Sequence, residues 1–288
     1  MTTQAAASSS NLAPRAAAKI RRLPFDWTGT ALAILLGIVI LVPLIVVGIW
    51  AFTEVWRYPS VLPQKFGLRF WHDTLGRADV WVALTTSLAL ATTVTAISAV
   101  ICLPAAYAFA RLDFPGRNAL FLSFLSVHAF PKFGLIVSIA AIFLGLHLIG
   151  TFWGVVLIQL VGTLMFMIWI PAAAFQGIDR RLEEAARDVG ANPLQVFFHV
   201  TLPQAAPTIA AAVLLSFVGT FYETEGAWLI GAPSVRSMPI LMISFINNQL
   251  VVQYGAVLSV ILWVPSFIAM LFARRFLGPQ ALGRGLGA

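Results

Sequence analysis

The sequence has little charge and a single cysteine. Only 10% of its 288 residues are charged, against roughly 25% in an ordinary soluble domain. Cys102 lies in an apolar run, so a disulfide within the chain is excluded and a cysteine metal site is not indicated. The sequence also lacks a Gly-x-x-x-x-Gly-Lys-Ser/Thr phosphate loop and any spacing typical of a nucleophile with its base or of metal ligands. We therefore expect neither catalysis nor nucleotide hydrolysis nor metal binding by this chain.

Hydrophobic residues make up most of what is present. They account for 60% of the chain, and the mean hydropathy is +0.91. A water-soluble fold has no place to bury so much apolar surface, so the composition predicts an all-α protein that crosses a membrane several times. The formal charge of +7 does not indicate nucleic acid as a partner. The arginines are scattered through loops beside apolar segments, where such residues set membrane topology.

Six apolar segments are predicted to span the membrane: residues 28–52, 82–110, 119–146, 152–175, 205–230 and 254–272. The first is longer than the apolar core of a signal peptide and no small-residue cleavage site closes it, so we expect it to be retained. The second is rich in Thr, Ser and Ala, which predicts a place inside the bundle. The expected organisation is a tail over 1–27, a six-helix domain over 28–276 and a tail over 277–288.

The positive charges predict the orientation of these spans. With the N-terminus inside, twelve of the 18 Lys and Arg residues fall on the cytoplasmic side and five on the outer side, and Lys132 falls within a span. An excess of Lys and Arg marks the cytoplasmic side of a membrane protein. Both termini and the charged segment over 178–203 are therefore expected in the cytoplasm.

The segment over 178–203 is the densest charged run, and it is predicted to begin with a short helix. Asp179 is expected to cap a helix that starts at Arg180, because its carboxylate can accept the free amide protons of the first turn. Within that helix Glu183 and Arg187 have the favourable spacing of four residues. Gly190 is expected to end the helix in a left-handed conformation.

A second helix is predicted after the glycine. Asn192 followed by Pro193 is typical of a helix N-terminus, and we expect this helix to end near Leu202 and Pro203. The first helix has a narrow apolar face formed by Leu182, Ala185, Ala186 and Val189. Helices that rest on lipid headgroups prefer Lys and Arg with bulky apolar residues. A face of small alanines with a rim of both signs favours a protein cleft instead.

The spacing within this segment resembles the "EAA" loop of permease subunits in ABC importers. That loop has Glu-Ala-Ala, Gly and Ile-x-Leu-Pro at fixed spacings, and this chain has Glu184-Ala-Ala186, Gly190 and Val200-Thr-Leu-Pro203. The resemblance implies a coupling helix that docks into a cleft of a cytoplasmic ATPase. The residues that it assigns to coupling are Glu183, Glu184, Ala185, Ala186, Arg187, Gly190, Leu202 and Pro203.

The wider chain, over about residues 28–288, is similar to the shorter permease of maltose-type carbohydrate importers. Shared features are Tyr107-Ala-Phe-Ala-Arg111, a Phe130-Pro131 break, Leu144-Gly-Leu146, a late acidic residue at Glu223 or Glu225, and Arg275-Phe-Leu-Gly with a Gly-rich tail. The resemblance implies the type I importer fold in a bacterial inner membrane, in contact with lipid. It also implies four partner chains: a second homologous permease, two ATPase subunits that bind ATP and Mg, and an extracytoplasmic solute-binding protein.

One departure leaves the solute open. Sugar permeases usually have Glu-Ala-Ala-x-x-Asp-Gly, whereas this chain has Asp188-Val189-Gly190. The form Glu-Ala-Ala-Arg-Asp-x-Gly is common in relatives that import polyamines, ferric ions or thiamine. A sugar or sugar derivative is the first expectation, and a polyamine, an opine-like or another charged solute is the second.

Ionisable and polar residues at membrane depth form a second candidate site, because charges there usually face a cavity or a partner. The candidates for the substrate pathway are His128, Lys132, Tyr222, Glu223, Glu225 and Asn247. Two alternatives stay open: His128 and Lys132 could lie at an interfacial bend near Pro131, and Glu223 could pair with Lys132 rather than contact solute. We expect Glu223 and Glu225 on opposite sides of a helix. Asn247 could equally belong to a solvated turn.

Two rival functions remain. An ion-coupled secondary transporter could use Glu223, Lys132 and His128 as a relay and would need no ATPase. A membrane enzyme could use His128 and the glutamates, although no catalytic spacing favours it. The predicted coupling loop argues against the secondary transporter.

Overall fold

The computed structural model describes residues 27–57, 59–249 and 251–276, and for residues 125, 127, 128, 248, 249 and 273–276 it describes the backbone alone. The predicted tails, apart from Trp27, therefore lie outside the described residues. The chain divides into two units, residues 1–45 and 46–288. The described part of the first unit is the start of helix α1 (Trp27–Ala51), whose apolar side chains are mostly exposed.

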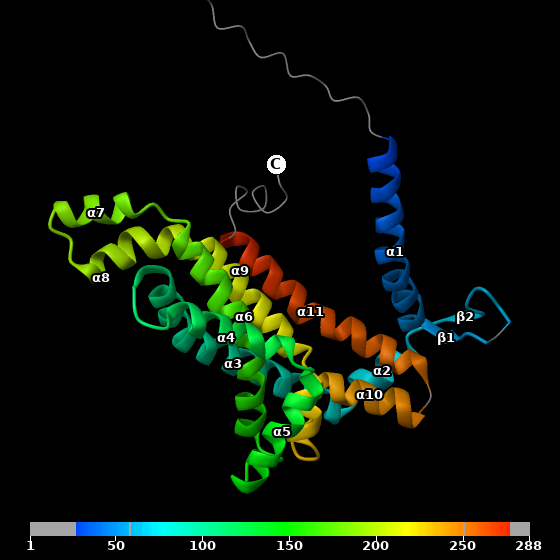
Figure 1. Cartoon of the computed structure of the whole chain (residues 1–288). Helices are drawn as coiled ribbons and strands as arrows, with labels where there is room; N and C mark the ends of the chain where they lie inside the picture. Colours follow the sequence, from blue (N-terminus) through cyan, green and yellow to red (C-terminus); the bar gives the residue numbers. More distant parts are fainter. Residues whose placement is uncertain (1–26, 58, 250, 277–288) are drawn as a thin grey trace, which may run out of the picture. The chain divides into compact units, whose positions relative to one another are not determined.

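The second unit is almost entirely helical (Figure 1). A two-stranded antiparallel sheet of β1 (Thr53–Val55) and β2 (Lys65–Phe66) follows α1, and α2 (Arg69–Leu75) follows the sheet. The long helices are α3 (Ala78–Arg111), α6 (Phe152–Gln176), α9 (Leu202–Phe221) and α11 (Val252–Phe276). The shorter elements are α4 (Arg117–Ala129), α5 (Lys132–Gly145), α7 (Arg180–Asp188), α8 (Pro193–Val196), the π-helices η1 (Phe197–Thr201) and η2 (Ala227–Gly231), and α10 (Met238–Gln249).

Five helical segments in the described part of the chain are long and apolar enough to cross a membrane. They are Trp27–Ala51, Ala78–Arg111, Phe152–Gln176, Pro193–Phe221 and Val252–Phe272. The predicted third span, 119–146, is two helices rather than one. Phe130 is extended (φ −78°, ψ 149°) and Pro131 precedes α5, because proline disfavours a helical conformation in the residue before it.

The predicted fifth span, 205–230, is also interrupted. α9 ends at Phe221, and the chain turns through Glu223 before it enters η2. The prediction that Glu223 and Glu225 lie on opposite sides of one helix is therefore wrong. At the other end of α9 the prediction of a break at Leu202 and Pro203 is also wrong. There α8, η1 and α9 form one continuous helical segment, because the π-turns carry the hydrogen-bond ladder past the proline.

α3, α6 and α9 form the centre of the second unit. As predicted for the span over 82–110, small side chains on one face of α3 are buried, among them Ala83, Ser87, Ala91, Ser98 and Ala106. Small residues let helix backbones approach closely. The Ser98 and Thr163 hydroxyls are 2.5 Å apart across the α3–α6 contact. This pair of hydroxyls links α3 to α6 inside the bundle.

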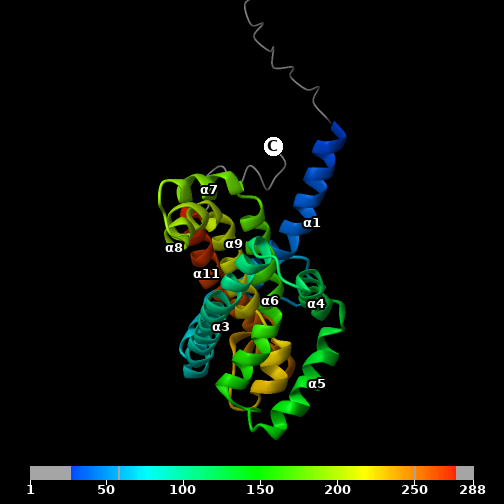
Figure 2. The ribbon, with the colours of Figure 1, turned by 60° about the vertical axis from the view of Figure 1, so that its left-hand side comes forward.

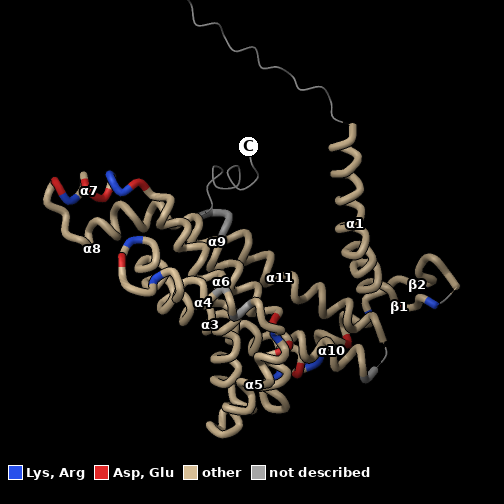
Figure 3. The backbone as a smooth tube through the Cα atoms, viewed as in Figure 1, with Lys and Arg blue, Asp and Glu red and all other residues tan. Residues whose placement is uncertain are grey.

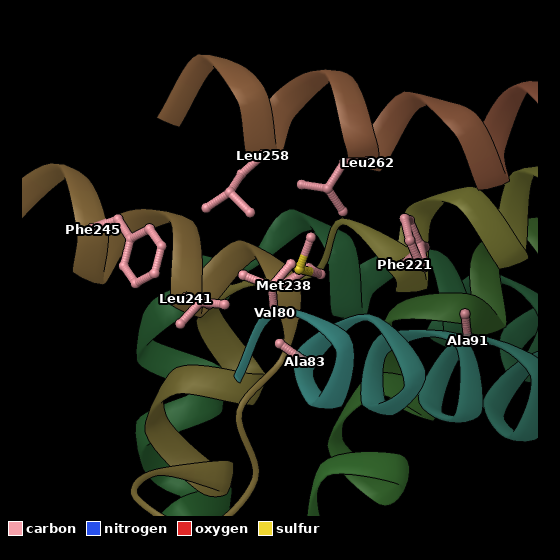
Figure 4. Close-up of a cluster of buried hydrophobic side chains, with 9 residues drawn as sticks. All are labelled: Val80, Ala83, Ala91, Phe221, Met238, Leu241, Phe245, Leu258 and Leu262. Atoms are coloured by element: carbon pink, nitrogen blue, oxygen red, sulfur yellow. The ribbon is translucent and has the colours of Figure 1, made fainter. Parts of the chain in front are cut away.

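α10 and α11 close one end of the bundle. Leu258 and Leu262 of α11 point toward Met238 and Leu241 of α10 and toward Val80 of α3 (Figure 4). α7 and α8 lie at the opposite end of the unit from α10 (Figures 1 and 2). The charged segment and the α10 region are thus separated by the length of the apolar helices.

Candidate functional site

The charged segment folds as its local sequence predicts. Asp179 caps α7 by accepting from the Arg181 amide at 3.0 Å. Gly190 is left-handed with φ +92°, and the backbone bond from the Ala191 amide to the Ala186 carbonyl (3.1 Å) closes the end of the helix. The predictions of a cap at Asp179 and a left-handed Gly190 are confirmed.

The start of the next helix has a complete capping box. The Asn192 side chain accepts from the Gln195 amide at 2.9 Å, and the Gln195 side chain accepts from the Asn192 amide at 2.9 Å. Pro193 occupies the first helical position, where its missing N–H costs nothing. The predicted N-terminus at Asn192 is confirmed, and the loop between α7 and α8 has a fixed conformation at both ends.

α7 leaves its apolar side uncovered in this chain. Leu182 is half exposed, and Val189 and Leu194 are 86% and 70% exposed. Glu184 and Ala185 are also exposed. Charged residues of both signs stand along α7 (Figure 3). The outer surface of α7 and α8 is therefore a small apolar patch with a charged rim, a composition suited to a protein partner.

Glu183 differs from the other charged residues of α7 because its side chain is buried. Its carboxylate lies 2.9 Å from an Arg111 guanidinium nitrogen and accepts from the Thr201 hydroxyl at 2.8 Å. The expected ion pair between Glu183 and Arg187 is absent among the described contacts. Arg111 is the better partner because it comes from another buried element and also donates to the Ile178 carbonyl at 3.0 Å.

A cavity of about 300 Å³ lies beside the two helix interruptions. Phe130 and Lys132 border it at the α4–α5 break, and Glu223 and Gly226 border it between α9 and η2. Gln159 of α6 also lines the wall. In transporters, interrupted helices commonly surround the solute pathway, because their free backbone groups are tolerated where they line a cavity.

Glu223 organises this cavity wall. Its carboxylate accepts from the Gly226 amide (2.8 Å) and the Ala227 amide (3.1 Å), so it caps the helical turns leading into η2. It also accepts from the Gln159 side chain at 3.1 Å and from Lys132 at 3.2 Å. The pairing of Glu223 with Lys132, which the sequence left open, is the arrangement found.

Lys132 also contacts Glu225 at 3.2 Å. Lys132 and Glu225 are 56% and 48% exposed, whereas Glu223 is 12% exposed. One lysine faces two carboxylates, so the cluster carries a net charge of −1 if all three groups are ionised. Lys132 and Glu225 are therefore the solvent-exposed members of the cluster, and Glu223 is the buried one.

The remaining pathway candidates are not gathered into one site. The Tyr222 hydroxyl donates to the Leu262 carbonyl at 3.1 Å, so it links the end of α9 to α11. Asn247 lines a second cavity of about 670 Å³ together with Glu225, Trp228 and Arg236. His128 lies in α4, but its side chain is outside the described residues. Among the described residues no group of His, Cys, Asp and Glu is arranged to hold a metal ion.

A family model described as "Binding-protein-dependent transport system inner membrane component" matches residues 100–277, more than half of the chain. The chain belongs to this family. The matched range contains the charged loop, both helix interruptions and the cavity between them. Members of the family are non-catalytic permease subunits of ABC transporters, and so is this chain.

Two of the curated relatives of this permease subunit are named as permease proteins of sugar transport systems. It is 31% identical over 241 residues to the maltose/maltodextrin transport system permease protein MalG of Salmonella typhimurium. The match covers 76% of this chain and 80% of MalG. It is 29% identical to the trehalose transport system permease protein SugB of Mycobacterium tuberculosis, over 70% of this chain and 75% of SugB. The resemblance to carbohydrate permeases is therefore confirmed at the level of sequence.

Solved structures show the same fold. A bacterial ABC transporter that imports the acidic polysaccharide alginate matches this permease subunit with a TM-score of 0.65 and 19% identity, over 87% of this chain and 96% of that one. The MetNI methionine ABC transporter matches with a TM-score of 0.56 and 19% identity, over 69% and 96%. The importer permease fold is therefore shared with transporters of unlike solutes.

The sequence did not identify three residues that contribute to the charged segment and to the cavity. Arg111 and Thr201 hold Glu183, and Gln159 holds Glu223. Arg111 ends the motif Tyr107-Ala-Phe-Ala-Arg111, which was noted as part of the resemblance, and an arginine at the end of an apolar helix usually serves only topology. Its contact with Glu183 joins residues 72 positions apart, which no local pattern reveals.

Proposed function

We propose that this chain is one of two permease subunits of a binding-protein-dependent importer in a bacterial cytoplasmic membrane. It would move a polar solute, first of all a sugar or sugar derivative, inward by alternating access. Two partner ATPases would bind ATP with Mg and supply the energy. An extracytoplasmic binding protein would deliver the solute, and lipid would surround the spans.

The observation that carries this proposal is the outer surface of α7. Its exposed apolar residues and Glu184 stand on a loop whose two ends are fixed by Asp179 and by the Asn192–Gln195 capping box. A rigid, exposed, partly apolar knob suits a cleft in a cytoplasmic partner. The excess of Lys and Arg on the same side of the spans supports a cytoplasmic location.

The proposed topology has six crossings with both termini in the cytoplasm. In this arrangement α4 and α5 together make one crossing, interrupted at Phe130 and Pro131. Neither helix alone is long enough, because a crossing needs about 20 residues. A fluorescent or alkaline-phosphatase fusion at the end of each span would test this order of sides.

The solute pathway is proposed to run past the cavity between the two helix interruptions. Gln159 and the Lys132–Glu223–Glu225 cluster offer donors and acceptors that suit hydroxyl groups. The relatives MalG and SugB, permease proteins of maltose/maltodextrin and trehalose transport systems, support this class of solute. The excess of carboxylate over lysine in the cluster supports a cationic solute, such as a polyamine, as the second candidate.

The test is ATP-driven uptake by the assembled transporter in liposomes. Radiolabelled maltose, trehalose and spermidine are offered with the cognate binding protein, and ATP is supplied on the side of the ATPases. The proposal requires ATP-dependent accumulation of one solute and its loss in Glu184→Lys. Uptake that follows an imposed proton gradient and needs no ATPase would establish the secondary-transporter alternative instead.

A further inference from the structure

Arg111 and Glu183 form an ion pair inside the protein at the end of the bundle that carries α7. The guanidinium and carboxylate are 2.9 Å apart, and their side chains are only 7% and 8% exposed. Among the residues that the structure describes, Glu183 is the only acidic or basic residue that is buried as a whole. Every other ion pair described in this chain has at least one partner that is more than a quarter exposed.

This pair joins three separate parts of the chain. Arg111 is the last residue of α3, Glu183 lies in the first turn of α7, and Thr201, which donates to the same carboxylate, ends η1. Arg111 also donates to the Ile178 carbonyl, just before the cap of α7. The inner side of α7 is therefore fastened at its start to α3 and to the helical segment that continues as α9.

A buried pair of this kind is expensive to desolvate, and replacing it with apolar residues is often neutral for stability. What the buried ion pair provides that apolar side chains would not is therefore a fixed geometry, and not additional stability. Directed, charge-assisted hydrogen bonds fix both the position and the rotation of α7, whereas apolar contacts let helices slide. η1 adds to the argument, since π-turns inside helices frequently occur at functional sites.

We propose that Arg111 is a positioning residue that makes α7 and the end of α3 move as one body. This rests on the proposed function, in which a partner ATPase pushes on the outer surface of α7. The force then enters α3 directly through Arg111 and enters α9 through Thr201 and η1. α3 and α9 both pack on α6, which carries Gln159 at the cavity. In this role Glu183 acts through its inward contact with Arg111 rather than by touching the ATPase.

The experiment measures one distance in the assembled transporter, purified with its partner permease and ATPases. Spin labels are placed at Asp113→Cys, whose side chain is 85% exposed just after α3, and at Asp188→Cys, exposed at the end of α7. The native Cys102 is buried and will not react. The label distance is recorded by electron paramagnetic resonance without nucleotide and after trapping with ATP and vanadate.

With Arg111 in place, the distance is expected to stay within ~2 Å between the two states, which is the scale of ordinary helix shifts. In Arg111→Met the distribution should broaden and shift on trapping by more than that. Arg111→Lys keeps the charge and should restore most of the narrow distribution. Arg117→Met is the matched control. It removes a nearby arginine at the start of α4 whose ion pair is with Asp113, which the label already replaces, and not with Glu183, so it should change nothing.

If Arg111→Met does not assemble, the double variant Arg111→Met/Glu183→Met carries the same test, because it leaves no buried charge unpaired. An unchanged distance on trapping in either variant would overturn the proposal, since the peptide connections alone would then suffice. Failure of the proposed function has a different signature. If the proposed function is wrong, the unmodified chain will not co-purify with an ATPase. This outcome is seen without comparing any variants.

Discussion

The Nζ atom of Lys132 lies 3.2 Å from a carboxylate oxygen of Glu223, across 91 residues of sequence. This ion pair joins the two places where apolar segments predicted as single spans are interrupted. Lys132 opens α5 after the Pro131 break, and Glu223 follows the end of α9. The two interruptions therefore meet at the wall of one cavity.

The two members of this pair should contribute unequally to stability. Glu223→Ala removes the acceptor of two backbone amides and one glutamine side chain, so it should lower the free energy of unfolding by about 1–2 kcal/mol, as expected for loss of a helix cap. Lys132→Met should cost less than about 1 kcal/mol, because its pair is partly exposed and screened. Thermal unfolding of the assembled complex measures both. Equal destabilisation by the two substitutions would contradict this assignment.

Glu184→Lys should abolish ATP-driven uptake and co-purification of the ATPase while the permease remains folded in the membrane. The side chain is exposed on the outer surface of α7, so a reversed charge there disturbs a partner rather than the chain itself. Affinity purification and protein quantification of membranes would separate the two effects. Arg117→Glu, a charge reversal at a partly exposed side chain at the start of α4, is the control. Full uptake by Glu184→Lys would remove the coupling role.

Gly190→Val should destabilise the turn between α7 and α8 by about 1–2 kcal/mol, because an L-residue in the left-handed region carries a steric cost. A Cβ atom at this position would meet open space, so the effect comes from the backbone and not from a clash. Gly190→Asn should retain more function, since asparagine tolerates this conformation better. ATPase activity of the assembled complex, measured for both variants, checks this order. Equal activities would show that the left-handed turn is unimportant.

Asn192→Ala should lower stability by about 1 kcal/mol through loss of the capping box at α8. The substitution removes the side-chain oxygen that accepts from the Gln195 amide, and it leaves the backbone amide of residue 192 that donates to the Gln195 side chain. Amide hydrogen exchange at residues 194–196 should accelerate while exchange in α6 stays unchanged. Asn192→Asp retains an acceptor and serves as the control. Unchanged exchange in Asn192→Ala would mean that packing alone holds this turn.

The β1–β2 hairpin should loosen in acid. Lys65 lies 2.5 Å from Glu54 and, by its hydrogen bond, holds the pKa of that carboxyl below its usual value. A lowered pKa means that the stabilisation is present at neutral pH and is lost as the pH falls through the lowered value. Glu54→Gln should remove this dependence. Exchange of the Gly67 amide, which bonds to Phe52 at 3.0 Å, reports it, and identical pH profiles in the two proteins would refute it.

Helix starts and helix ends could be predicted from the sequence where a single residue, such as a capping Asp or a left-handed Gly, sets the local backbone conformation. The cap at Asp179, the left-handed Gly190 and the helix start at Asn192 and Pro193 were all read correctly, because each depends on interactions within a few residues. The small-residue face of α3 was also correct, since composition alone indicates close helix packing. The apolar segments themselves follow from hydropathy.

Helix continuity was less predictable. The end of α9 before Glu223 and its continuity with η1 at Leu202 were both misjudged. Hydropathy does not register where a backbone hydrogen-bond ladder is interrupted. At Glu223 the interruption is stabilised by donors from α5 and α6, which are distant in sequence, together with the nearby Gly226 amide. At Leu202 the π-turns of η1 keep the segment continuous although Pro203 cannot donate.

The sequence by itself determined that this chain is an apolar, multi-span protein with a charged loop matching the coupling loop of importer permeases. Composition, hydropathy and short-range spacing carry that information, since each depends on neighbouring residues. Only the tertiary structure decided that Glu183 turns inward to Arg111 and that Lys132 meets Glu223 and Glu225. Those contacts depend on which helices pack together, and packing is set by the whole chain rather than by any segment of it.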